Sequence, residues 1–217
     1  TAWAPMLFAT AEAASTEEGA QFMQQFYPDT YQNESGLRIA RTLERLFQYT
    51  TGDALYADFD VSYENFFSGK AAMIPNGYWM MDQIPEEWQD KVRFSAFPGN
   101  RLISSPETFG WAIVSSYSQE VKEGAAALLK LRTQMNMEQR EELFEQSPDS
   151  LTQAERDYIE TYKSGPVLVP NYQVKWNSIL QEETLGTILP DLAQGKISPE
   201  EFTKKEDESI QEFLEEQ

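Results

Sequence analysis

Helical spacing dominates the pattern of apolar and polar positions along this chain. Over residues 35–47, apolar side chains recur three and four positions apart, and three arginines fall outside that stripe. Ser35 is the predicted N-cap of this helix, and Gly52 is its predicted end. The apolar stripe consists of Leu37, Ala40, Leu43, Leu46 and Phe47.

Capping residues followed by acidic first turns predict two more helices. Ser15 or Thr16 precedes two glutamates and an apolar run that stops at Pro28. Ser198 precedes Pro199 and two glutamates, the order typical of a helix N-terminus. We therefore expect one helix before Pro28 and a terminal helix that begins at Pro199.

Three further helical regions lie between these ends. One begins at Ser118, and residues 135–162 predict two charged amphipathic helices broken at Ser147–Pro148. From Asn171 onward the pattern predicts a long helix that Pro190 kinks or breaks. The apolar face of the helix from Ser118 consists of Val121, Ala125, Leu128 and Leu129.

Strand signals are few and short. Lys70–Ile74, Val92–Phe97 and Gly110–Ser115 are apolar segments bounded by Gly, Pro, Asn or Ser, and helical stretches separate them. This alternation favours a helix-rich α/β fold with a short mixed sheet over a helical bundle.

Composition and charge exclude several classes of function. Of the 217 residues, 41% are hydrophobic, so the chain should fold; its net charge of −19 disfavours nucleic acids and anionic membranes. The chain has no His and no Cys, which excludes Ser-His-Asp and Cys-His triads and the usual zinc sites. With 36 acidic residues, a carboxylate pair carries no information by itself. We expect no cofactor.

Two stretches resemble a phosphate-binding loop and a calcium-binding loop, but neither has the residues that its motif requires. Gly69–Lys70 would need a Gly where Glu64 stands and a Ser or Thr where Ala71 stands, so no phosphate loop is predicted. The alternating acids of residues 58–64 place Tyr63 where a calcium loop needs Gly. The sequence thus predicts no metal site here, only a solvated helix start.

Residues 66–84, FFSGKAAMIPNGYWMMDQI, differ from ordinary scaffold. A strand that ends at Ile74 must turn sharply at Pro75–Gly77, because Pro fixes φ and Gly tolerates positive φ. Tyr78 and Trp79 would then stand at the start of a helix, near free backbone N–H groups. An indole face beside such donors suits a sugar, with its apolar face and its rim of hydroxyls. The alternative is that Trp79 is buried in the core.

The same run resembles the signature of extracellular solute-binding proteins of ABC importers, the maltose-binding-protein-like family. Its members carry an aromatic residue, Gly-Lys-x-Ala-Met, a short strand and Gly-x-Trp; this chain has Phe66 or Phe67, Gly69–Met73 and Gly77–Trp79. GWAIVSSYSQEVKEGAAALLKLRT and WNSILQEETLGTILPDLAQGKISPEEF are similar to later segments of the family. The resemblance runs from about residue 35 to the end.

The resemblance implies two α/β lobes that close like a hinge over a ligand. It identifies residues 1–217 with the C-terminal lobe of a periplasmic-binding-protein-like fold of type II. Residues 106–165 would be an excursion that packs on the N-terminal lobe. Without that lobe, part of the excursion should either repack on this lobe or expose an apolar face that recruits another copy. The chain opens TAWAPML, without an initiator Met or a signal-type segment, so we expect a processed or cut piece of a longer protein.

Carried over by position, Trp79 is the expected stacking residue in the cleft, and Tyr78 and Asn76 flank it. Trp3 and Trp176 are further candidates that motif matching does not fix. Trp111 is expected in a packed strand, and Trp88 on the surface. One lobe supplies half a cleft, so weak ligand binding is expected.

These observations favour a non-enzymatic binder that delivers a carbohydrate to membrane permease subunits. It would act outside the cytoplasm, with the full-length form anchored as a lipoprotein. Three alternatives remain open: a polyamine binder in which acids such as Asp82 hold the cation, a carboxylate-based glycosidase, and an acidic helical module that binds protein.

Overall fold

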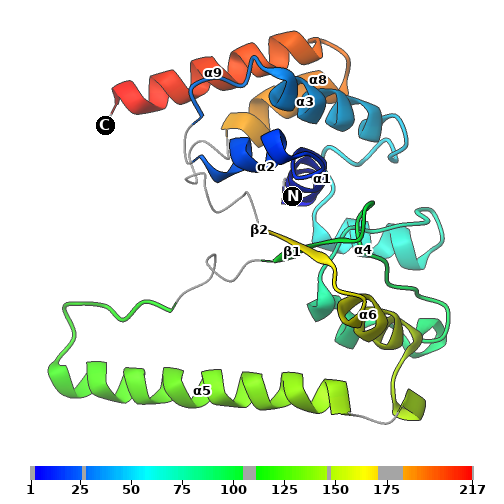
Figure 1. The fold of residues 1–217 in the computed structure, drawn as a ribbon, viewed down its shortest axis with the longest axis vertical. Coiled ribbons are helices and arrows are strands. Elements are labelled where there is room, and N and C mark those ends of the chain that lie inside the picture. The colour runs from blue at the N-terminus through cyan, green and yellow to red at the C-terminus, as the bar shows by residue number, and fades with distance from the viewer. Residues whose placement is uncertain (1–2, 26–27, 105–110, 146–147, 171–182, 217) are drawn as a thin grey trace. The chain divides into compact units, whose positions relative to one another are not determined.

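A computed structural model describes residues 3–25, 28–104, 111–145, 148–170 and 183–216. These residues form a helix-rich fold with a parallel sheet of two strands (Figure 1). The chain divides into two compact units. Unit 1 comprises Thr1–Met80, Ala96–Ser105 and Pro166–Gln217, and unit 2 comprises Met81–Ser95 and Pro106–Gly165. None of the helices in the described ranges is both long and apolar enough to span a bilayer.

Unit 1 is built mainly from helices packed around one apolar cluster. Helix α1 packs on α2 and α3, and α3 packs in turn on α8 and α9. The helices of this unit are α1 (Trp3–Ala13), α2 (Glu17–Gln24), α3 (Glu34–Phe47), α4 (Phe59–Phe67), the π-helix η5 (Thr184–Ile188), α8 (Leu189–Ala193) and α9 (Pro199–Glu215).

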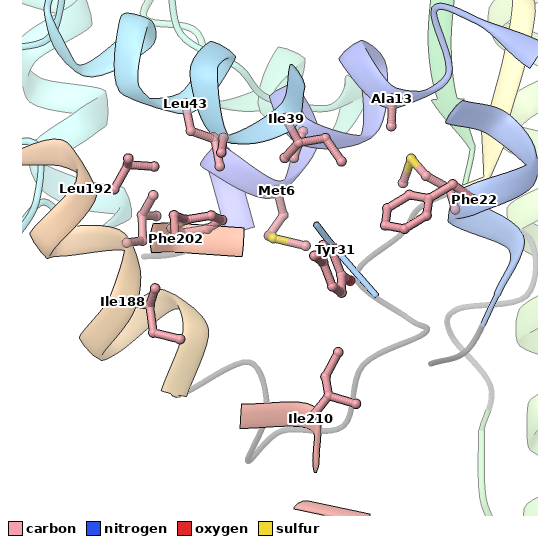
Figure 2. Close-up of a cluster of buried hydrophobic side chains, with 14 residues drawn as sticks. Met6, Ala13, Phe22, Tyr31, Ile39, Leu43, Ile188, Leu192, Phe202 and Ile210 are labelled. Carbon is pink, nitrogen blue, oxygen red and sulfur yellow. The ribbon is translucent and has the colours of Figure 1, made fainter. Parts of the chain in front are cut away.

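The core of unit 1 joins helices from both ends of the chain. Figure 2 shows Met6 of α1, Ile39 and Leu43 of α3 and Phe202 of α9 in this cluster. Tyr31, in the segment before α3, contacts Phe22 edge to face, with ring centroids 5.1 Å apart. Asp207 of α9 fixes that same segment, because it accepts hydrogen bonds from three groups of residues 30–32. The terminal helix is therefore an integral part of the unit.

Local capping signals predicted two helix starts correctly and one incorrectly. Thr16 caps α2 by accepting from the N–H of Gly19 at 3.1 Å, and Ser198 forms a capping box with Glu201 at the start of α9. The cap of α3 is Asn33, whose side chain accepts from the N–H of Gly36 at 2.9 Å; Ser35 lies buried inside the helix. Helix α3 also ends at Phe47, before the predicted stop at Gly52.

The predicted strands are wrong, although the expectation of little strand is confirmed. Among the described residues, Lys70–Ile74, Val92–Phe97 and residues 111–115 form no strand, and Gly110 lies outside the description. The sheet instead pairs β1 (Arg101–Ser104) with β2 (Val167–Pro170) in parallel, with Leu102 opposite Leu168. A strand needs a neighbour for its backbone N–H and C=O groups. Lys70 and Ala71 instead donate their N–H groups to the carbonyl of Asn65, at the end of α4.

Unit 2 contains the 3-10 helices η2 (Glu86–Trp88) and η3 (Pro148–Ser150) and the helices α5 (Gln119–Glu145) and α6 (Gln153–Lys163). The predicted break between α5 and α6 is confirmed, and Thr152 and Glu155 form a capping box that starts α6. Asp157 of α6 binds Arg93 through two hydrogen bonds, at 2.5 and 3.0 Å. These bonds fasten the irregular segment around Arg93 to α6.

The predicted effect of Pro190 is visible in the described part of its helix. The π-helix η5 ends at Ile188, and Pro190 lies in the first turn of α8. Because Pro lacks an N–H and crowds the preceding turn, a widened turn directly before it relieves the conflict. Residues 171–182 of the predicted helix lie outside the described residues.

Candidate functional site

The aromatic stretch from Asn76 to Met80 forms a compact local structure at the end of the first segment of unit 1. Residues 70–77 are irregular, and the 3-10 helix η1 (Tyr78–Gln83) follows them. The expectation of a strand leading into a helix is therefore replaced by a loop leading into one tight helical stretch. We call residues 76–80 the aromatic platform.

Trp79 lies on the surface of unit 1, where 51% of it is exposed. Tyr78 is exposed to the same extent, and the two rings meet at an interplanar angle of 67° with centroids 6.0 Å apart. The alternative that Trp79 is a core residue is wrong. Two large rings that remain half exposed give this loop an apolar surface that a ligand could cover.

Contacts of Asn76 and Met80 fix the shape of the platform. The side chain of Asn76 accepts from the N–H of Gly77 at 2.9 Å, and its amide group lies 3.1 Å from the sulfur of Met80. Met80 is buried, and its N–H donates to the carbonyl of Gly77 at 3.0 Å. Asn76 is partly buried and uses its side chain in these contacts. We therefore interpret Asn76 as a residue that shapes the platform.

Of the remaining predicted site residues, the structure describes only the side chain of Asp82. Trp3 is the first residue of α1, but its side chain lies outside the description, and Trp176 lies outside it entirely. Asp82 is exposed within η1. A shared site for Trp79, Trp3 and Trp176 stays a prediction.

Two other tryptophans lie in unit 2. Trp111, expected in a packed strand, is 64% exposed and outside any strand, and the guanidinium of Arg132 lies 4.6 Å from its ring centroid. Trp88 is half-buried at the end of η2, with the ammonium of Lys91 5.3 Å from its ring centroid. Both rings thus lie near a cation of their own unit.

Sequence reasoning missed Met80 as part of the site. Its burial anchors the loop from inside, and its position four residues after Asn76 was the available signal. Sequence reasoning also placed Met73 in a strand, whereas its side chain is 86% exposed in the loop before the platform.

The chemistry available at the platform is stacking and hydrogen bonding. Among the residues that the structure describes, no group of three or more Asp or Glu side chains is arranged to hold a metal ion. The side chains of residues 76–80 include no carboxylate and no amine.

Comparisons of the chain with protein-family models, with curated proteins and with solved structures found no match.

Proposed function

We propose that this chain is part of an extracytoplasmic solute-binding protein of an ABC importer and that it binds carbohydrate without catalysis. The observation that carries the proposal is the half-exposed ring of Trp79, in the segment that resembles the family signature. A stacked sugar would cover the apolar ring face, and nearby polar groups could bind its hydroxyls.

In this proposal, residues 1–217 form the C-terminal lobe of a type II periplasmic-binding-protein-like fold. The helix-rich architecture supports this assignment, although a parallel sheet of two strands stands in place of the expected mixed sheet. The proposed excursion, residues 106–165, makes up most of unit 2. Its helix α5 exposes large apolar side chains at Val121, Leu128 and Met135, which supports packing against another surface.

The first experiment measures ligand binding directly. The 217-residue chain, labelled with ¹⁵N, is titrated separately with maltotriose, cellotriose and spermidine while indole and amide resonances are followed by NMR. NMR detects the weak binding expected of a single lobe. Shifts around Trp79 with a trisaccharide support the proposal; shifts with spermidine alone would replace the sugar with a cationic ligand.

The second experiment tests the residue. Trp79→Ala should weaken binding by about 2 kcal/mol, as expected for an aromatic hot spot. Trp88→Ala is the matched control, because Trp88 is an aromatic residue of the other unit, and it should leave the affinity unchanged. Unchanged affinity of the Trp79→Ala variant, with its circular dichroism intact, would remove Trp79 from the site.

A further inference from the structure

Gly77 lies directly beneath the indole of Trp79. If Gly77 carried a Cβ atom, that atom would lie 2.1, 2.2 and 2.5 Å from three consecutive carbons of the six-membered ring of Trp79. An atom beyond the edge of a ring cannot be this close to three consecutive ring atoms. The position therefore lies over the ring face, and the ring covers the Cα of Gly77.

Backbone conformation does not explain the glycine. Gly77 is absent from the glycines of positive φ, which are Gly69, Gly99, Gly165 and Gly195, so an L-residue could adopt its backbone angles. This corrects the expectation that the turn needs Gly for a positive φ. What position 77 requires is space, and the group that fills the space is the ring of Trp79.

We propose that Gly77 is a positioning residue for the stacking function: its missing side chain lets the indole of Trp79 lie flat on the backbone, and this packing fixes the ring in its half-exposed position. This inference rests on the proposed function for its ligand, but the packing itself can be tested without one.

The neighbouring contacts preorganise this arrangement. The N–H of Gly77 is bound by Asn76, its carbonyl accepts from Met80, and the ring of Tyr78 meets that of Trp79 at 67°. The backbone under the ring is thus fixed on both sides of the Cα of Gly77. A ring held in this way loses less conformational entropy when a ligand stacks on it.

A substitution at Gly77 should move the ring and preserve the fold. The atoms that a new Cβ would meet first belong to the far end of a side chain, which can rotate away, and not to backbone. Gly77→Ala should therefore displace the ring of Trp79 from its place over the backbone of residue 77 and weaken binding of maltotriose about tenfold. Gly52→Ala is the matched control, since Gly52 is in the same unit, has no positive φ and has open space at its Cβ position.

The decisive measurement is ligand-free NMR of the 217-residue chain. A ring face over Gly77 should shift a Gly77 Hα resonance upfield, and Trp79→Ala should abolish that shift. The Trp79 indole resonance should move in Gly77→Ala and stay in place in Gly52→Ala. A Gly77 Hα at its ordinary position, or an indole resonance insensitive to Gly77→Ala, would overturn the proposal.

A double-mutant cycle adds an independent test. Gly77→Ala should lower stability when Trp79 is present and should cost much less in a Trp79→Ala background, because the clash is then absent. Equal costs in both backgrounds would refute the packing. If the packing holds and neither maltotriose nor cellotriose binds, the proposed function fails while the placement of the ring stands.

Discussion

Asp157 and Glu206 are both buried carboxyl groups, but their neighbours move their pKa values in opposite directions. Burial alone would raise the pKa of Asp157, but hydrogen bonds from Arg93, Gln153 and the N–H of Phe94 outweigh it and lower the pKa. Glu206 is fully buried in α9, and burial raises its pKa to about 8. The number of donors thus decides which form of a buried carboxyl is stable.

Glu206 has one hydrogen-bond partner where Asp157 has three. The hydroxyl of Thr184 donates to its Oε2 at 2.9 Å, while Oε1 is buried without a hydrogen bond. The charges that act on it, Asp207 and Glu183, are negative and raise its pKa further. On the neighbouring elements, Arg41 of α3 is paired with Glu200, and Asp191 of α8 is paired with Lys196.

We predict that stability falls as the pH rises and that Glu206→Gln removes much of this dependence. The folded pKa, about 8, exceeds the ordinary value of 4.5. The contribution of Glu206 is therefore fully present below pH 4.5 and is lost as the pH rises through about 8. The pKa shift of Glu206 sets an upper bound, on the order of 5 kcal/mol, on the free energy of unfolding that is lost over this pH range.

Urea unfolding at pH 5, 7 and 9 tests this prediction, since those values cover the interval between the two pKa values. The Gln variant should be the more stable protein at the highest pH, because it cannot ionise. Exposed Glu208 provides the control, as Glu208→Gln should leave the slope of stability against pH intact. Parallel profiles for wild type and Glu206→Gln would show that the carboxyl is not held neutral.

At the scale of elements, what the sequence could predict depended on how local the signal was. The caps at Thr16 and Ser198 and the break before Pro148 depend on a few adjacent residues, and all three were predicted. The sheet was not, because β1 and β2 are separated by more than 60 residues and pair only through tertiary structure. The exposure of Trp79 likewise depends on tertiary structure, which the local sequence does not specify.

The candidate site shows the same division. The sequence predicted Tyr78 and Trp79 together at the start of a helix, directly after a turn, and their position in one exposed platform follows from their adjacency. The role of Gly77 could not be derived from the turn, because a glycine required for positive φ and a glycine required for space look the same in a sequence. Only the structure distinguishes the two reasons, because Gly77 has no positive φ and the ring of Trp79 occupies the space beside it.

Two glycines of unit 2 occupy different positions relative to a helix: one lies inside a helix and the other directly after a helix C-cap. Gly124 lies inside α5 with open space at its Cβ position, so Gly124→Ala should stabilise the helix by about 0.5–1 kcal/mol. Gly165 follows the C-cap of α6 with a φ of +70, and Gly165→Ala should destabilise by about 1 kcal/mol.

The two substitutions are chemically identical and both positions are open, so they form a matched pair within one unit. Thermal unfolding followed by circular dichroism should show midpoint shifts of opposite sign. Shifts of the same sign would mean that the backbone conformation at Gly165, or the helical state at Gly124, differs from the one described.

At the scale of the whole molecule, an exposed apolar stripe coexists with a large negative charge. On α5, Val121, Leu128 and Met135 are spaced seven residues apart, so they share one side of the helix, and they are 50%, 64% and 51% exposed. The net charge of −19 makes copies of the chain repel one another. Apolar attraction and charge repulsion therefore oppose each other.

We predict weak self-association through this stripe, and we expect it to strengthen as salt is added. The screening length falls from about 30 Å at about 0.01 M salt to about 8 Å at about 0.15 M salt, so repulsion between copies weakens while apolar attraction persists. Leu128→Glu should abolish the association by placing a charge on the stripe. Sedimentation velocity at both salt concentrations measures the effect.

Ala126→Glu is the matched control for the added charge. It lies two residues from Leu128 and therefore on the opposite side of α5, where its side chain is exposed. Both variants carry the same net charge, so repulsion between whole molecules is equal in the two, and only contact through the stripe differs. Equal association of the two variants would mean that copies meet elsewhere, and a monomer at both salt concentrations would mean that the stripe does not pair with itself.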